Sequence, residues 1–322
     1  MSKVKNIKSF PVFILVCLSF LTAYTYAQDT HMRDTGPFVV VLGTVQDAGS
    51  PHINCLKDCC AELHEKPDPS RKVVSLGIVD PATKQTWLIE ATPDMPDQLR
   101  MLRTYAPFMN SDVPDGVFIT HAHIGHYTGL MYFGREAMGA KEVAVYAMPR
   151  MRTYLENNGP WDQLVKLKNI DLFELNDNQK VHLSPNVSIT PVMVPHRDEY
   201  SETVGYRIEG PSKSLLFIPD IDKWQKWDED IVKVVGSVDH AFIDATFYDG
   251  NEIGHRNISE IPHPFVIESM ELFDPQPLDT RNKIRFIHLN HSNPLLDRDS
   301  REFEDVHKKG YHVAIPGDIC YL

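Results

Sequence analysis

The chain has 322 residues, of which 42% are hydrophobic, and its formal net charge at pH 7 is −12. A chain of this length can bury a sizeable core, and its acidic balance excludes the basic surface on which nucleic-acid binders depend. The sequence contains no internal repeat, low-complexity segment or long Gly/Ser- or Pro-rich linker, so we expect one large domain.

The first 27 residues have the pattern of a secretory signal peptide. Three lysines precede a nearly continuous apolar run from Phe10 to Tyr24, and Thr25 and Ala27 are small residues at positions suited to signal peptidase. The apolar run is shorter than the ~20 residues of a membrane-spanning helix, so no stable membrane anchor is expected. We therefore expect residues 1–27 to be removed, residues 28–322 to form a single domain, and the protein to be periplasmic or secreted.

Short apolar runs rich in β-branched residues recur along the rest of the chain and end at Gly, Pro, Asp or His, which predicts strands that lead into loops. The predicted strands are Phe38 to Leu42, Val73 to Val79, Thr86 to Ile89, Gly116 to Ile119, Glu142 to Tyr146, Val187 to Val194, Val204 to Ile208, Ser214 to Ile218, His240 to Ile243, Ile284 to His288, His312 to Ile315 and Ile319 to Leu322. Helical spacing of apolar residues predicts helices at Met95 to Tyr105, Tyr127 to Met138, Met148 to Asn157, Trp224 to Val235, Phe265 to Phe273 and Arg298 to Lys309. Interleaved strands and helices of this kind predict an α/β fold with sheets between helices.

Three histidines lie within six residues, at His121, His123 and His126, directly after the apolar run Gly116 to Ile119. We expect them in a loop at the end of a strand, where several imidazoles can lie close together. Neutral imidazole is a common ligand of Zn, Fe, Ni and Cu. A chance surface cluster is the alternative, but the further His and Asp residues downstream favour a metal site.

The segment His121 to His126 resembles the His-x-His-x-Asp-His motif of the metallo-β-lactamase superfamily, and Val41 to Thr44 resembles the turn after the first strand of its members. Within the superfamily, Gly49 to Cys55 and Ile287 to Pro294 resemble segments of the coenzyme PQQ synthesis protein B group and the related phosphodiesterases. The likeness runs from Phe38 to the carboxyl end. It implies a four-layer αββα sandwich with the metal site at one edge.

The resemblance also implies a set of metal ligands. His121, His123 and His196 match the ligands of a first metal. His126 and Asp220 match ligands of a second metal, with Asp220 in the position that bridges both.

A last ligand is implied at His288, and His291, three residues further along, is the alternative. Gly125 departs from the motif, because the superfamily has an aspartate there that ligates the second metal. The second metal could keep fewer ligands, the site could hold a single metal, or a neighbouring residue could replace the carboxylate. The candidate replacements are His291, Asp47 and Asp222.

A divalent metal at this site would lower the pKa of a bound water and polarise a carbonyl or phosphoryl oxygen, so we expect hydrolysis. His263 resembles the helix-start histidine of the superfamily's phosphodiesterase and tRNA-processing branches and is the candidate proton donor for the leaving group. Asp244 matches a carboxylate that supports the metal ligands. The alternative for His263 is a histidine at the start of a helix without a catalytic role. The alternative for Asp244 is a cap at the end of a strand.

Three cysteines lie within six residues, at Cys55, Cys59 and Cys60. Related proteins carry a Cys-x-Cys-x-x-Cys zinc site here, so the resemblance implies an additional structural zinc despite the different spacing. A disulfide from Cys55 to either neighbouring cysteine, or free thiols, are the alternatives. The candidates for a fourth zinc ligand are His52, His64 and Cys320. Asp47, His52 and Cys55 all follow the first strand, and the alternative is that they line the active pocket.

We therefore expect an exported metal-dependent hydrolase that uses a metal-bound hydroxide on a small phosphodiester, ester or lactone substrate. It would bind one or two divalent metals, with Zn favoured and Fe or Mn as alternatives. Two other functions are open: an Fe-dependent oxidase or oxygenase similar to the PQQ synthesis protein B group, and a non-catalytic metal- or ligand-binding protein. Hydrolysis of β-lactams is not expected, since the likeness is to another branch.

Overall fold

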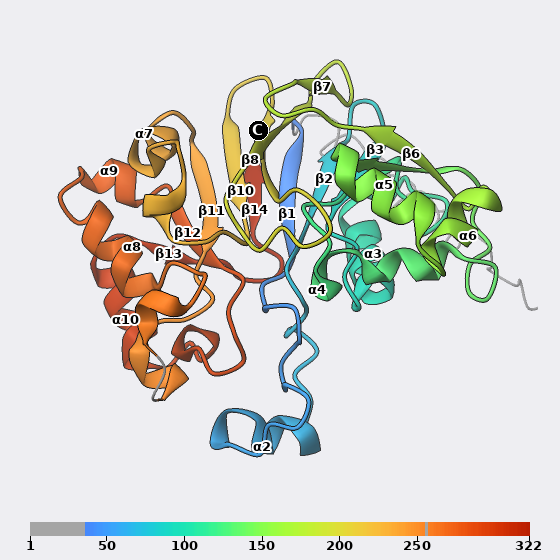
Figure 1. The fold of residues 1–322 in the computed structure, drawn as a ribbon. Helices are drawn as coiled ribbons and strands as arrows, with labels where there is room; N and C mark the ends of the chain where they lie inside the picture. The colour runs from blue at the N-terminus through green and yellow to red at the C-terminus, as the bar shows by residue number, and fades with distance from the viewer. Residues whose placement is uncertain (1–35, 255–256) are drawn as a thin grey trace, which may run out of the picture. The chain divides into compact units, whose positions relative to one another are not determined.

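Two mixed β-sheets of seven strands each form the centre of the computed structural model, which describes residues 36–254 and 257–322 (Figure 1). The first sheet has the order β14-β1-β2-β3-β4-β5-β6 and the second has the order β13-β12-β11-β10-β9-β8-β7. The predicted signal peptide, residues 1–27, lies outside the described residues. Among the helices of the described ranges, none is long and apolar enough to cross a membrane.

The strands of both sheets are short. Those of the first sheet are β1 (Phe38–Gly43), β2 (Ser75–Asp80), β3 (Gln85–Ile89), β4 (Gly116–Phe118), β5 (Val143–Ala147), β6 (Ile170–Glu174) and β14 (Ile319–Tyr321). Those of the second sheet are β7 (Val181–His182), β8 (Ser188–Met193), β9 (Val204–Glu209), β10 (Ser214–Ile218), β11 (His240–Asp244), β12 (Ile284–Ile287) and β13 (His312–Val313).

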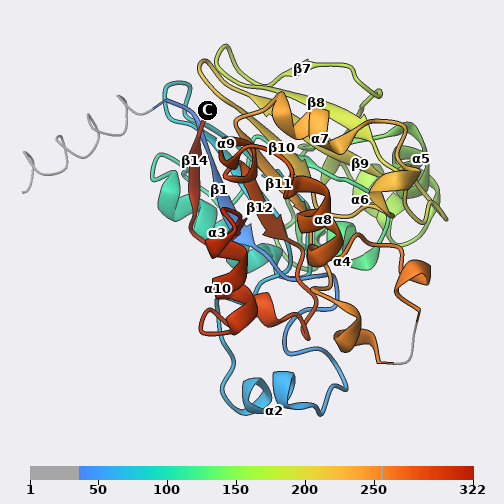
Figure 2. The ribbon, with the colours of Figure 1, turned by 90° about the vertical axis from the view of Figure 1, so that its left-hand side faces the viewer.

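The α-helices are α2 (Asp58–Glu65), α3 (Met95–Tyr105), α4 (Ile124–Tyr127), α5 (Pro149–Asn157), α6 (Trp161–Lys166), α7 (Ile231–Gly236), α8 (Val266–Phe273), α9 (Leu278–Arg281) and α10 (Arg301–Lys308). Short 3₁₀ helices lie at Thr128–Phe133, Trp224–Lys226, Gly250–Ile253, Ile258–Glu260 and Pro294–Leu296. The segment that contains α2 extends beyond the strand ends in both ribbon views (Figure 1, Figure 2).

The alternation of side chains along the strands produces the layers. In β1, Val40 and Leu42 pack with the apolar residues of α3 and α5, whereas Val39 and Val41 pack against the second sheet. The second sheet places its other face against α7, α8 and α10. Successive strand residues point to opposite faces, so each sheet has one face toward the other sheet and one toward helices. This is the four-layer αββα sandwich that the resemblance implies.

Most predicted elements lie within two residues of their observed bounds, and the predicted helix Met95 to Tyr105 has the bounds of α3. The prediction misses β6, β7, α2, α6 and α9. These elements are short or, like β6, carry several exposed residues, so their apolar periodicity is weak.

Two predicted helices are wrong over much of their length. Tyr127 to Met138 forms the end of α4 and a 3₁₀ helix. There the chain pairs with the segment after β3: the N–H of Gly129 donates to the Ala91 carbonyl at 2.8 Å, and the N–H of Ala91 donates to the His126 carbonyl at 2.9 Å. Trp224 to Val235 is divided into a 3₁₀ turn and α7. Trp227 is extended between them and donates its indole N–H to the Met193 carbonyl at 2.8 Å.

Neighbouring strands of both sheets deliver polar residues to one edge of the sandwich. Strands β3, β4 and β5 are parallel, as are β10, β11 and β12. The carboxyl ends of parallel strands lie at one edge, which is where sites in α/β proteins form. The residues that follow these ends within three positions are Glu90, His121, Asp220 and His288, and Asp244 is the last residue of its strand.

Candidate metal centre

Seven acidic and histidine side chains from five segments meet at this edge and form two groups around Asp220. Within each group, and within a third formed by Asp220, Asp244, His263 and His288, the ligand atoms all lie within 4.8 Å of one another. The first group is His121, His123, His196 and Asp220, and the second is Asp47, His126, Asp220 and His288. Asp220 is 2% exposed, so it is a buried carboxylate shared between two sets of histidines.

The first group is arranged around one oxygen of Asp220. Its Oδ2 lies 3.3 Å from Nε2 of His121, 3.2 Å from Nε2 of His196 and 3.9 Å from Nδ1 of His123. Nε2 of His121 and Nδ1 of His123 lie 2.9 Å apart. These four donor atoms are the combination of imidazole and carboxylate that zinc and related divalent metals accept.

The second group is arranged around Asp47. Its Oδ1 lies 3.0 Å from Nε2 of His126 and 3.0 Å from Nε2 of His288. Nε2 of His126 is also 3.8 Å from Oδ2 of Asp220. His288 has φ +66°, an unusual backbone conformation for a residue with a side chain. Such strain is held in place at functional sites by the surrounding structure.

A buried carboxylate that sequence reasoning missed, Glu90, orients two of the histidines. Nδ1 of His126 donates to Oε1 of Glu90 at 3.1 Å. Thr120 donates its hydroxyl to the same oxygen at 2.5 Å and accepts from Nδ1 of His121 at 2.8 Å. The signal for Glu90 was available, because an acidic residue directly follows the apolar run Thr86 to Ile89.

The other histidines are oriented in the same way. The Thr246 hydroxyl accepts a hydrogen bond from Nδ1 of His288 at 2.8 Å and donates one to Oδ1 of Asp244 at 2.7 Å. Nε2 of His123 donates to Glu199 at 3.2 Å. A hydrogen bond at one ring nitrogen fixes the tautomer and leaves the other nitrogen for a metal.

The hydrogen-bond network fits bound cations. Nε2 of His121 and Nδ1 of His123 face each other with both ring hydrogens committed elsewhere, so two lone pairs meet at 2.9 Å. Both ring nitrogens of His196 are buried without a hydrogen-bond partner. Buried polar atoms of this kind are costly unless something satisfies them, and a divalent cation would do so.

The protonation of the site follows from its burial and charges. Burial lowers the pKa of His121, and nearby His126 lowers it further, which keeps His121 in the neutral form that binds metals. Burial also disfavours the charged form of His126, but Asp47 and Glu90 outweigh it and hold the pKa of His126 well above its usual range. Burial would raise the pKa of Asp47, but His126 and His288 hold it well below its usual range.

His263 lies beside the bridging carboxylate. Its Nδ1 is 2.9 Å from Oδ2 of Asp244 and 3.2 Å from Oδ1 of Asp220. Burial lowers the pKa of His263, but Asp244 and Asp220 outweigh burial and raise it to about 10. Asp244 also accepts hydrogen bonds from the backbone of Ile221 and Thr246, so it fixes the loop after β10 as well as His263.

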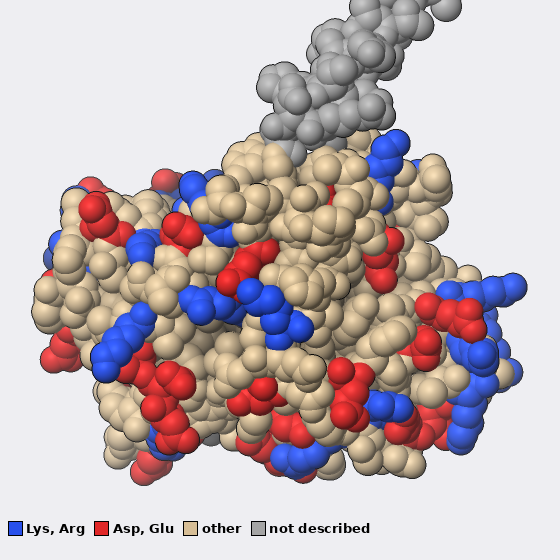
Figure 3. Space-filling view, turned by 90° about the horizontal axis from the view of Figure 1, so that it is seen from above, with Lys and Arg blue, Asp and Glu red and all other residues tan. Residues whose placement is uncertain are grey.

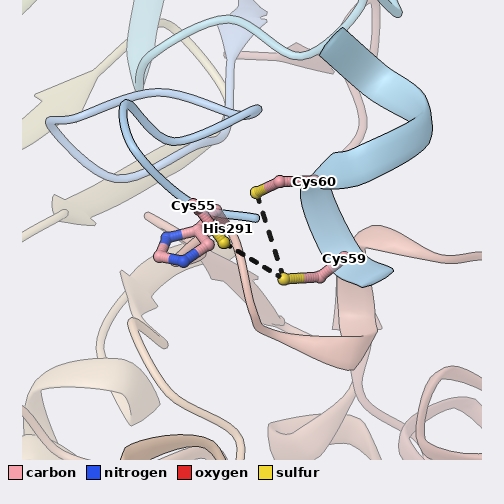
Figure 4. A group of neighbouring side chains, drawn as sticks. All are labelled: Cys55, Cys59, Cys60 and His291. Carbon is pink, nitrogen blue, oxygen red and sulfur yellow. Dashed lines mark hydrogen bonds between the residues drawn. The ribbon is translucent and has the colours of Figure 1, made fainter. Parts of the chain in front are cut away.

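The three neighbouring cysteines form a separate group with His291, whose ligand atoms lie within 4.8 Å of one another (Figure 4). Sγ of Cys59 lies 3.9 Å from Sγ of Cys55 and 4.0 Å from Sγ of Cys60. The structure therefore places His291 with the cysteines. His288 lies instead in the histidine cluster, which comprises His121, His123, His126, His196 and His288 with Asp47 and Asp220. All four described cysteines are free thiols.

None of the fourth ligands expected from the sequence belongs to this cysteine group. His64 contacts the Cys55 carbonyl through Nε2 at 3.1 Å, and Cys320 lies in the core between the sheets. His52 packs against the His291 ring in a tilted arrangement, with the ring centroids 4.4 Å apart, so it lines the cysteine group rather than the histidine cluster.

Asp222 does not reach the histidine cluster. Its carboxylate accepts from the backbone N–H of Lys223 at 2.7 Å and pairs with Nζ of Lys226 at 2.7 Å. Of the three residues that the sequence offers as replacements for the missing motif carboxylate, the structure places only Asp47 against the histidines.

Comparisons with known proteins agree with this arrangement. A family model described as a beta-lactamase superfamily domain matches residues 85–295. Coenzyme PQQ synthesis protein B from Methylorubrum extorquens strain PA1 is 24% identical over 306 residues, which cover 87% of this chain and 98% of that protein. The protein of the same name from Methylorubrum populi is 26% identical over 309 residues and has the same coverage of both chains.

Solved structures share the fold. Zinc-bound PqqB from Methylobacterium extorquens has a TM-score of 0.69 at 22% identity and covers 88% of this chain and 100% of that chain. A diphosphatase from the PhnP family has a TM-score of 0.60 at 20% identity and covers 89% of this chain and 97% of that chain. Because the family model matches well over half of the chain, this protein belongs to the metallo-β-lactamase superfamily.

Proposed function

We propose that this protein is an exported metal-dependent hydrolase that cleaves a small phosphodiester, ester or lactone substrate. The proposal depends on one observation: the buried carboxylate of Asp220 lies between two groups of imidazole nitrogens. Two cations joined by one carboxylate suit the attacking and leaving oxygens of an in-line displacement. Phosphodiesters are therefore the first substrates to test.

His121, His123 and His196 would hold the first metal together with Asp220, and His126, His288 and Asp47 would hold a second with the same aspartate. Zinc is favoured over iron and manganese, because three or more imidazoles with a carboxylate are typical of catalytic zinc sites. When bound, such metals lower the pKa of water and polarise a substrate oxygen.

His263 is suited to give a proton to the leaving group. Asp244 fixes the ring through Nδ1, which leaves Nε2 as the nitrogen that can face a substrate. The contact of 2.9 Å with the Asp244 carboxylate favours the protonated ring that a general acid requires. Nδ1 of His263 lies 3.2 Å from Oδ1 of Asp220, so the His263 ring is directly beside the proposed metal ligands.

Export and a small-molecule substrate rest on the sequence and surface. The lysines and apolar run of residues 1–27 support export. On the face shown in Figure 3, basic side chains are interspersed with acidic ones rather than gathered into one patch. With a net charge of −12, this pattern supports a small-molecule substrate over a nucleic acid.

The likeness to coenzyme PQQ synthesis protein B favours a second candidate, an iron-dependent oxidase or oxygenase. Histidines with a carboxylate also suit Fe(II). Metal analysis of the untreated protein separates the two candidates. Stoichiometric iron together with O₂ consumption would favour oxidation, whereas zinc or manganese would favour hydrolysis.

The hydrolase proposal is tested with the mature chain, residues 28–322, loaded with zinc or manganese and offered phosphodiester, ester, lactone and β-lactam substrates. We expect phosphodiester cleavage, and we expect His121→Ala to lower kcat/KM by more than about 100-fold, since changes outside the ligand shell already cost 10- to 100-fold. Asp222→Asn should match the wild type, because Asp222 pairs with Lys226 and not with the histidines. A metal-loaded protein that cleaves nothing in the panel, with His121→Ala equal to wild type, would overturn the proposal.

Glu90 should control metal affinity without being a ligand. Glu90→Gln removes the negative charge that orients His126 and His121, so zinc affinity should fall by about 10- to 100-fold. The matched control is Glu199→Gln, because Glu199 also contacts a histidine but its side chain is 51% exposed, and its loss should change affinity about fivefold or less. Competition titration with a chelating dye measures both. Equal effects of the two variants would contradict the role of Glu90.

We also propose that Cys55, Cys59, Cys60 and His291 hold a structural zinc. Three thiolates and one imidazole form a closed set of four ligands that is typical of structural sites. Cys59→Ser and His291→Ala should each lose one zinc equivalent and lower the thermal midpoint, whereas Cys320→Ser should keep the full zinc content. Loss of two titratable thiols in the untreated protein, with no zinc affected by these variants, would instead identify a disulfide.

A further inference from the structure

The glycine at position 125 has no room for a side chain. A Cβ there would lie 2.6 Å from Cβ and 2.9 Å from Cγ of Asp47, and still closer to its Cα. The obstacle includes backbone as well as side chain, so rotation of the Asp47 side chain cannot relieve it. Gly125 is not one of the glycines with a positive φ. The close approach of Asp47, and not the backbone conformation, therefore requires glycine at position 125.

The group that occupies this space carries a carboxylate into the histidine cluster. Oδ1 of Asp47 lies 3.0 Å from Nε2 of both His126 and His288. Those two histidines commit their other ring nitrogens to Glu90 and Thr246. Because a carboxylate and an unprotonated nitrogen repel each other, these contacts need either an extra proton on each ring or a shared cation.

Backbone pairing fixes the approach of Asp47 to His288. Val45 forms a parallel bridge with Leu289, the residue after His288. The N–H of Gln46 donates to the Leu289 carbonyl at 2.9 Å, and the N–H of Leu289 donates to the Thr44 carbonyl at 2.8 Å. The loop after β1 is thus joined to the loop after β12 on the amino side of Asp47.

A turn holds the loop on the carboxyl side of Asp47. The N–H of Gly49 donates to the Gln46 carbonyl at 2.9 Å, and Gly49 has φ +79°. Glycine adopts this left-handed conformation without steric cost. Asp47 therefore lies within a closed turn whose two ends are fixed, and its carboxylate has little freedom to leave the cluster.

We propose that Asp47 is the carboxylate ligand of the second metal, and that its backbone and side chain together exclude any side chain at position 125. The inference rests on the proposed metal-dependent function. The carboxylate ligand of the second metal then comes from the loop after β1. Binding of the second metal therefore depends on a segment that is far from the histidine motif in sequence. The loss of the carboxylate at position 125 is then an exchange and not a loss of the second metal.

The first test is Asp47→Asn, which keeps the shape of the side chain and removes its charge. We expect one fewer equivalent of bound zinc at low free zinc, with affinity at that position reduced by more than about 100-fold. Asp222→Asn is the matched control, because this neighbouring candidate carboxylate is paired with Lys226 instead. Equilibrium dialysis followed by elemental analysis gives the readout without any assay of activity.

The second test places a side chain at position 125. Gly125→Asp should lower both the second zinc equivalent and the denaturation midpoint, because the new side chain meets the backbone of Asp47. Adding Asp47→Gly should not restore that zinc equivalent, because the Cα at position 47 remains against the new Cβ. If Gly125→Asp does not fold, Asp47→Asn still decides whether Asp47 is a ligand.

The outcomes separate this inference from the proposed function. Wild-type zinc content in Asp47→Asn, or wild-type zinc content and denaturation midpoint in Gly125→Asp, would overturn this inference. In either case, a zinc equivalent that is still lost in His121→Ala would leave the first metal and the proposed function in place. Identical zinc content in the wild type, His121→Ala and Asp47→Asn would overturn both.

Discussion

The burial of Asp220 among histidines from both sheets is the interaction on which the rest of the site depends. Its Oδ2 lies 3.2 to 3.9 Å from ring nitrogens of four histidines, and the side chain is almost completely removed from water. An ionised carboxylate is costly to bury unless it is paired. The strand ends of both sheets therefore have to converge for this aspartate to be tolerated, and their convergence creates the metal centre.

Polar partners behind the histidines complete this arrangement. Glu90, Thr120 and Thr246 contact the ring nitrogens that face away from Asp220. Each follows a strand of one sheet by no more than two residues, so the hydrogen bonds that orient the rings come from the same edge as the rings themselves. The sandwich thus supplies both the ligands and the groups that fix their tautomers.

The loop after β1 serves two clusters at once. Asp47 reaches His288, and Cys55 lies near His291, so two parts of this loop meet two residues of the loop after β12. His52 packs against His291, with its ring tilted to the His291 ring.

The resemblance and the apolar runs predicted the layers, the histidines, Asp220 and Asp244, because strand ends and motifs are local patterns. Asp47 was one of three candidate replacement carboxylates, but the sequence could not single it out, since it lies 79 residues from His126 and reaches it only through the pairing of Val45 with Leu289. The partner of the cysteines was not predicted, because the sequence offered His52, His64 and Cys320 as fourth ligands and His291 only as a ligand of the second metal.

Anomalous diffraction at the zinc edge from a crystal of the zinc-loaded protein tests the central claim most directly. The account predicts two peaks in the histidine cluster. One would contact His121, His123 and His196, the other would contact His126, His288 and Asp47, and Asp220 would lie between them. A single peak in the cluster with Asp47 out of contact would contradict the second position, and the absence of any peak at Asp220 would contradict the metal centre as a whole.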